Sequence, residues 1–164
     1  MNNLVERIKE RNFPVLFTKE DINKSGIGNN NLDIYFNEAL EKGMIENVYT
    51  DYYVLGKGIR DVYIPEVVIS QMLDKKSYVS TYSVLSDADW ILDGVFTISS
   101  VTEGNTKIID TDQFGSYTYD NIYKNINMAG IYWESINKYK YKRAKPLRAL
   151  CDMLVMRNEN ICDV

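Results

Sequence analysis

The pattern of apolar and polar positions predicts three short helices in the first 43 residues. Apolar residues recur at helical spacing in residues 2–11, and Pro14 ends this helix because proline cannot continue it. Thr18, with Asp21 three positions later, predicts the N-cap and first turn of a second helix. Two glycines within residues 25–28 then predict a turn, since glycine tolerates a positive φ.

A third helix and a hairpin follow. Asn30 or Asn31 is expected to cap the helix, and Gly43 to end it. Its predicted apolar face comprises Leu32, Phe36, Ala39 and Leu40. Residues 45–48 and 52–55, rich in β-branched and aromatic side chains, predict two paired strands. Three short helices and a hairpin are typical of a winged helix-turn-helix. We prefer this interpretation to a helical bundle with an incidental hairpin, because the turn falls between the second and third helices.

The remainder of the chain mixes helices and strands. Pro65 and Ser80 are each expected to begin a helix, and a last helix is predicted from Pro146 to Met156. Alternating β-formers predict strands over residues 95–101, 106–109, 117–119 and 131–136. The inward positions predicted for the last helix are Leu147, Leu150, Cys151, Leu154 and Val155. The sequence therefore predicts an α+β protein, with a winged helix-turn-helix domain over residues 1–60 and a small mixed α/β domain over residues 61–164.

Composition argues against an enzyme. The 164 residues contain no histidine, which removes the commonest general base and metal ligand. The two cysteines, Cys151 and Cys162, lack the spacing of a zinc site, and Cys151 is predicted to be a small buried apolar residue. We therefore expect no cofactor and no metal. No apolar run approaches the roughly 20 residues that span a bilayer, and the first residues lack a signal-peptide core, so a cytoplasmic location is expected.

One acidic pair could suggest a metal-dependent nuclease. Asp110 and Asp112 lie two residues apart, and on a strand they would share a face that could hold magnesium. The following Gln113-Phe114-Gly115 instead favours a turn, in which aspartate bonds to the backbone. We favour the turn.

The net charge of −4 is unevenly distributed. Residues 1–62 hold 8 basic and 10 acidic side chains, residues 63–137 hold 4 and 10, and residues 138–164 hold 7 and 3. Such a protein can bind DNA if its basic groups converge on one face. The candidate DNA contacts at helix N-termini and beyond the hairpin are Lys19, Lys24, Ser25, Asn29, Asn30, Asn31, Lys57 and Arg60. Acidic residues on the third helix would repel phosphate, so a protein-interaction module that kept the fold stays open as an alternative.

The strongest electrostatic feature is the segment of residues 138–145. Its alternation at period two would place lysines on one strand face and tyrosines on the other. The basic residues are Lys138, Lys140, Lys142, Arg143 and Lys145. We favour a solvated edge strand protected by lysines over a contact for nucleic acid or an acidic partner, and both interpretations stay open.

Four segments together resemble the AbiEi antitoxin family, the regulator half of AbiE abortive-infection toxin–antitoxin pairs. Residues 17–22 resemble the start of its second winged-helix helix, and residues 40–45 with 51–55 resemble its helix end and wing. Tyr78-Val79-Ser80 with Ser83-Val84-Leu85 is similar to a "Tyr-Ile-Ser … Ser-Ala-Leu" segment, and residues 146–152 to a "Pro-Glu-Lys-Ala-Leu-x-Asp" helix. Leu147 replaces the family's usual glutamate, and Ala88-Asp89 replaces its His-Gly.

This resemblance implies an antitoxin that also represses its own operon. The N-terminal domain would bind the promoter DNA, with a homodimer as one possible form on a palindrome. The C-terminal domain would counteract a nucleotidyltransferase-like toxin, in a type IV scheme that needs no stable complex. No enzymatic activity and no membrane partner are implied. A plain transcriptional regulator without antitoxin activity stays open as an alternative.

Overall fold

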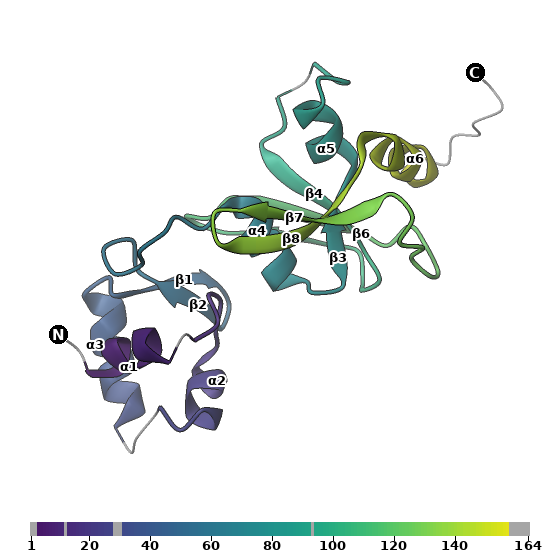
Figure 1. Cartoon of the computed structure of the whole chain (residues 1–164). Helices are drawn as coiled ribbons and strands as arrows, with labels where there is room; N and C mark the ends of the chain where they lie inside the picture. Colours follow the sequence, from purple (N-terminus) through teal and green to yellow (C-terminus); the bar gives the residue numbers. More distant parts are fainter. Residues whose placement is uncertain (1–2, 12, 28–30, 93, 158–164) are drawn as a thin grey trace. The chain divides into compact units, whose positions relative to one another are not determined.

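The computed structural model describes residues 3–11, 13–27, 31–92 and 94–157 of the chain, which divides into two units, Met1–Tyr63 and Ile64–Val164 (Figure 1). Helices and strands are mixed, as predicted for an α+β protein, and the strands of the described residues form one two-stranded and one six-stranded sheet.

The N-terminal unit contains the three predicted helices, α1 (Asn3–Glu10), α2 (Lys19–Lys24) and α3 (Leu32–Glu41). The predicted cap of α2 is present, since Thr18 Oγ1 accepts the Asp21 backbone N–H at 3.1 Å and the Asp21 carboxylate accepts the Thr18 N–H at 2.8 Å. Asn31 occupies the N-cap position of α3. The apolar faces of the helices meet in a core that includes Leu4, Val5, Ile8, Phe17, Ile22, Leu32, Phe36, Ala39 and Ile45.

The predicted hairpin is formed by β1 (Ile45–Tyr49) and β2 (Tyr52–Leu55). Gly43, at φ +63°, supplies the left-handed residue that lets the chain leave α3. The sequence did not predict a further bridge, in which Phe17 and Tyr53 exchange two backbone hydrogen bonds of 3.0 and 2.8 Å. The residue before the N-cap of α2 therefore joins the free edge of β2, which ties the helices to the hairpin.

The second unit is built on a six-stranded sheet in the order β5-β6-β4-β3-β8-β7 (Figure 1). Its strands are β3 (Ser77–Val79), β4 (Thr97–Thr102), β5 (Lys107–Asp110), β6 (Ser116–Asp120), β7 (Ile131–Ile136) and β8 (Tyr139–Ala144). Its helices are α4 (Glu66–Leu73), α5 (Thr81–Asp87) and α6 (Pro146–Met156). The central strand β3 pairs antiparallel with β4 and parallel with β8. The sequence did not predict β3, because only three residues form this strand.

Helices α4 and α6 cover opposite faces of this sheet. The Ser70 hydroxyl of α4 lies 3.1 Å from that of Ser100 in β4, whereas the Tyr78 hydroxyl of β3 reaches Asp152 of α6. Tyr78 pairs with Val101, the neighbour of Ser100, and successive side chains of a strand point to opposite faces. Tyr78 and Ser100 therefore mark the two sides of the sheet.

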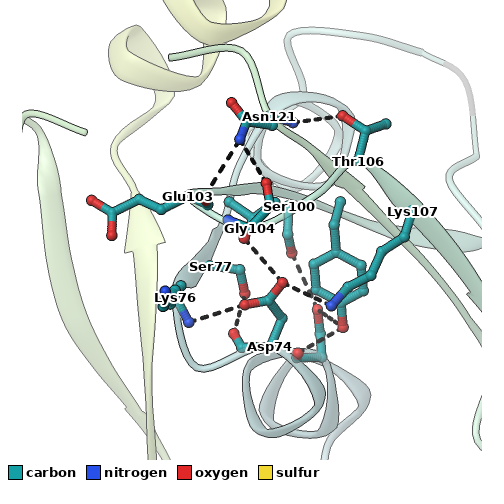
Figure 2. A network of polar contacts seen from close by, with 12 residues as sticks. Asp74, Lys76, Ser77, Ser100, Glu103, Gly104, Thr106, Lys107 and Asn121 are labelled. Atoms are coloured by element: carbon teal, nitrogen blue, oxygen red, sulfur yellow. Dashed lines mark hydrogen bonds and ion pairs between the residues drawn. The ribbon is translucent and has the colours of Figure 1, made fainter. Parts of the chain in front are cut away.

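A polar network fixes the end of α4 to the sheet (Figure 2). The buried Asp74 carboxylate accepts the Lys76 backbone N–H and the Thr102 hydroxyl, both at 3.0 Å, and forms an ion pair with Lys107 at 3.0 Å. The Ser77 hydroxyl donates to the Asp74 carbonyl at 2.7 Å. The network therefore joins α4, β3, β4 and β5 and has a structural role.

Two predictions for this unit are wrong. Helix α6 does not bury its apolar stripe, since Leu147 and Val155 are 67% and 39% exposed, whereas Ala149 and Asp152 are fully buried. The physical reason is that four hydrogen-bond donors draw Asp152 inward. Strand β8 is not an edge strand, because it lies between β3 and β7.

Candidate functional site

Asp152 is the centre of a buried polar network beneath α6. The Tyr78 and Ser80 hydroxyls donate to its Oδ2 at 2.9 and 2.6 Å. The Tyr123 hydroxyl and Arg148 Nε donate to its Oδ1, both at 2.7 Å. These donors come from β3, from the residue that precedes α5, from the loop before β7 and from α6 itself. The carboxylate thus joins segments that lie far apart in the sequence.

Arg148 neutralises this carboxylate. Its side chain is only 13% exposed, and the guanidinium carbon lies 5.6 and 5.1 Å from the ring centroids of Tyr78 and Tyr123. Its remaining donors reach the carbonyls of Asn127 and Ala129, each at 2.8 Å, and the Tyr78 hydroxyl at 3.0 Å. Arg148 therefore also fixes the loop that precedes β7.

The network perturbs the ionisation of its members in a consistent direction. Burial, together with the nearby Asp152 charge, raises the pKa of Tyr78 and of Tyr123 well above the ordinary tyrosine value. Burial tends to lower the pKa of Arg148, but the bond and charge of Asp152 outweigh it and the pKa is raised. At neutral pH these tyrosines are neutral donors and Arg148 is a cation.

A strained residue follows the network directly. Thr81 has φ +43°, which is rare for a β-branched residue, and its hydroxyl is buried without a hydrogen-bond partner among the described residues. Ser80, at the N-cap position of α5, makes no side-chain cap bond to that helix, contrary to its expected role. It bonds Asp152 instead. The strain at Thr81 therefore accompanies the turn that brings Ser80 to the carboxylate.

This arrangement is suited to positioning and not to acid–base chemistry. Asp152 is fully buried and both of its oxygens are occupied by donors, so it has no position for a substrate proton. An open hollow of about 460 Å³ lies beside it. The hollow is lined by Tyr123, Asn125, Asn127, Ala129, Gly130, Lys145, Leu147, Arg148 and Cys151. Cys151, predicted to be buried, is only partly so.

The predicted DNA contacts of the N-terminal unit are not brought together as a cluster of available cations. Lys19 forms an ion pair with Asp33 and lies 5.3 Å from the centroid of the Phe36 ring. Arg60 has a side chain only 9% exposed and pairs with Glu46 at 3.6 Å. Both cations are therefore committed within the unit.

The other predicted contacts are more accessible. Lys24 is 71% exposed and pairs with Glu20 one helical turn away, which raises the pKa of this lysine. Lys57 and Asn31 are exposed, while the Ser25 hydroxyl donates to the Ile22 carbonyl at 2.7 Å. Asn29 and Asn30 lie outside the described residues. Because exposed ion pairs contribute little free energy, Lys24 can exchange Glu20 for another anion.

The basic strand β8 shows the predicted alternation. Tyr139 and Tyr141 are buried, whereas Lys140 is exposed and Lys142 half-buried. Arg143 does not belong to the lysine face, because it pairs with Asp87 at 2.8 Å and with Glu134 at 3.3 Å. No ion pair joins Lys138, Lys140, Lys142 or Lys145 to an acidic residue of the described ranges.

Asp110 is the last residue of β5 and pairs with Ser116, and residues 111–115 connect β5 to β6, with Thr111 making the side-chain bonds to the backbone. The Thr111 hydroxyl donates to the Gly115 carbonyl at 2.6 Å and accepts the Phe114 N–H at 3.0 Å. Within the described residues no group of three or more histidine, cysteine, aspartate or glutamate side chains could hold a metal ion. None of the helices described is long and apolar enough to cross a membrane.

Comparison with protein-family models and with curated proteins yields no match for this chain.

Proposed function

We propose that the protein is a bacterial antitoxin and autorepressor without enzymatic activity. Its N-terminal unit would be a winged helix-turn-helix that binds the promoter of its own operon in the cytoplasm. Its C-terminal unit would counteract a nucleotidyltransferase-like toxin. The observation that carries this proposal is the Asp152 network, because it joins the two C-terminal segments on which the resemblance to the AbiEi family rests. Tyr78 and Ser80 belong to one segment, and Arg148 and Asp152 to the other.

The arrangement of the N-terminal unit supports the DNA-binding half. Three helices precede a hairpin, and the Phe17–Tyr53 bridge holds the entry to α2 against that hairpin. The turn between α2 and α3 is where a helix-turn-helix requires it. Among the predicted contacts in the described residues, the exposed ones are Lys24, Asn31 and Lys57. These three residues are the proposed contacts, with Asn29 and Asn30 from the sequence prediction.

Promoter binding is tested with the full chain and a labelled duplex from upstream of its own gene. We expect binding that weakens with salt, since each phosphate contact contributes a slope of about −0.9 in log K against log salt. Lys24→Gln with Lys57→Gln should reduce the slope by about two such contacts. Lys75→Gln with Lys76→Gln changes the net charge equally at two exposed lysines of the other unit and should leave the slope unchanged. Affinity equal to that for unrelated DNA, or insensitive to salt, would remove the repressor half.

The antitoxin half is tested by growth. If the product of the adjacent gene is toxic, co-expression of this chain with that product should restore growth. Variants disturbing the Asp152 network should lose the rescue, whereas Lys24→Gln with Lys57→Gln should keep it. A harmless neighbour, or toxicity that this chain does not relieve, would refute the antitoxin proposal.

A second candidate function is a protein-interaction module that no longer binds DNA. The outward face of α3 favours it, because Ile34 is 66% exposed there among Asp33, Glu38 and Glu41. Asp33 and Glu38 pair with Lys19 and Lys42, so a partner would meet an apolar centre with a rim of ion pairs. Co-purification of a stable complex, together with indifference to DNA, would select this function over the first.

A further inference from the structure

The outer hairpin of the six-stranded sheet combines an exposed aromatic ring with unpaired cations. In the β7–β8 register Trp133 lies opposite Lys142, and Ser135 lies opposite Lys140. Directly opposite residues of an antiparallel pair point to the same face. Trp133, Ser135, Lys140 and Lys142 therefore share one face, and Figure 1 shows these strands as the green hairpin at one side of the unit.

The ring is available for stacking. Trp133 is 59% exposed, although tryptophan is usually well buried. The Lys142 ammonium lies 5.6 Å from its ring centroid. Because β7 is an edge strand, no further strand of the sheet covers its outer side in the described residues. A ring with an ammonium group over one face can receive a nucleobase on its other face while the cation meets the adjoining phosphate.

No acidic residue of the described ranges neutralises the charges on this face. Lys140 and Lys142 have no acidic partner among the described residues, and neither does Lys138 at the turn of the hairpin. The nearest strand acid, Glu134, points to the other face, where it accepts the Tyr141 hydroxyl at 2.6 Å and pairs with Arg143. The hairpin thus separates its charges, with compensated ions on one face and free ammonium groups on the other.

We infer that this face binds single-stranded nucleic acid. Trp133 stacks on a base, and Lys138, Lys140 and Lys142 contact consecutive phosphates. A single strand is favoured over a duplex because its unstacked bases are open to an aromatic ring. The bases of a duplex are stacked, so a duplex would present mainly its phosphates to this face. The inference does not depend on promoter binding, since it uses different residues in the other unit.

The test uses two labelled single strands, 12-mers of uridine and of deoxythymidine, and a duplex of equal length. Both single strands should bind the full chain more tightly than the duplex at low salt, and the difference between them separates RNA from DNA as the natural source. For single strands each phosphate contact contributes about −0.7 to the salt slope. Lys140→Gln with Lys142→Gln should therefore reduce the slope by about 1.4, while Lys75→Gln with Lys76→Gln should leave it unchanged.

Stacking has its own readout. The only other tryptophan is Trp90, so a Trp90→Phe chain reports Trp133 fluorescence alone, and saturable quenching by the 12-mer is expected. Trp133→Thr keeps strand propensity but removes the ring, and it should weaken binding about 5- to 150-fold, the equivalent of one stacked base. Absence of single-strand binding, or binding that is unaffected by both the Trp133 and the lysine variants, would overturn the inference. Tighter binding of the duplex, without quenching of Trp133 fluorescence, would overturn the inference in favour of electrostatic attraction to phosphates alone.

Discussion

Removing the Asp152 carboxylate should strongly destabilise the C-terminal unit. Asp152→Ala leaves Arg148 as a buried cation without its counter-ion, and it deprives Tyr78, Ser80 and Tyr123 of an acceptor. Breaking a buried pair by removing one partner costs about 3–5 kcal/mol. Because the three hydroxyl groups also lose their acceptor, we expect the loss of unfolding free energy to lie at the upper end of this range. Since a domain has only about 5–15 kcal/mol of total stability, most of the margin would be lost.

The loss can be measured in this unit alone. Both tryptophans, Trp90 and Trp133, lie in Ile64–Val164, so urea unfolding followed by tryptophan fluorescence reports that unit. Asp152→Asn keeps the shape but also leaves Arg148 without its counter-ion and turns an amide NH2 toward two of the four donors, so it too should cost about 3–5 kcal/mol. Tyr82→Phe is a matched control, because it removes the hydroxyl that accepts an exposed hydrogen bond from Arg157. This variant should change the free energy of unfolding by less than about 0.5 kcal/mol.

A small effect of Asp152→Ala would refute a role of the network in stability. If Asp152→Ala costs no more than Tyr82→Phe, the network does not hold the sheet, the loop before β7 and α6 together. A large loss that appears equally in Tyr78→Phe alone would also contradict it, because that variant removes only one of the four donors. Circular dichroism of the folded variants checks that the comparison starts from the same structure.

Three further predictions concern other parts of the chain. Asp74→Ala, which removes the Lys107 partner in the network of Figure 2, should cost about 2–4 kcal/mol in the same urea assay, and a loss below 1 kcal/mol would refute its role. Gly43→Ala should lower the free energy of unfolding of the N-terminal unit by about 1–2 kcal/mol, because an alanine is strained at a φ of +63° even though there is space for its Cβ. Thermal unfolding followed by far-ultraviolet circular dichroism measures this loss, and an unchanged melting curve would contradict the prediction. Burial and the bond to Glu134 raise the pKa of Tyr141 to about 12, so the unfolded chain loses this proton first and stability should fall from about pH 10 upward. Urea midpoints between pH 8 and 11 should fall less steeply in Tyr141→Phe, and equal slopes would refute the assignment.

Local signals in the sequence were sufficient for most of the elements. The capping pair Thr18 and Asp21, the left-handed Gly43 and the alternation along β8 each depend on near neighbours, and each is present in the structure. Strand β3 was missed because three residues carry too little periodicity to indicate a strand. The Phe17–Tyr53 bridge joins residues 36 positions apart, and no local pattern indicates such a pairing.

The polar network shows why the site itself was harder to predict. The apolar residues of α6 indicated an inward stripe, but the structure turns Asp152 inward because four donors compensate its burial. Tyr78, Ser80 and Asp152 were indicated only by the resemblance of their segments to segments of the AbiEi family. Tyr123 carried no signal at all, because its role depends on a loop whose path the sequence does not specify. Such compensation is a property of the assembled fold and not of any single segment.

The distribution of ion pairs gives the two proposed nucleic-acid surfaces different electrostatic properties. Of the proposed contacts in the N-terminal unit, Lys24 pairs with Glu20, so a phosphate there must replace a carboxylate and the gain from that contact is reduced. The exposed Lys57 forms no ion pair with an acidic residue of the described ranges. On β8 Lys140 and Lys142 form no ion pair with an acidic residue in the part of the chain that the structure describes, so phosphate displaces only water and counter-ions there. Salt slopes measured on one protein with both lysine pairs varied therefore separate the surfaces. If only the β8 pair changes the slope, the fold of the N-terminal unit serves a protein partner. If both pairs change it, each with its own preferred strand form, the two units bind nucleic acid independently.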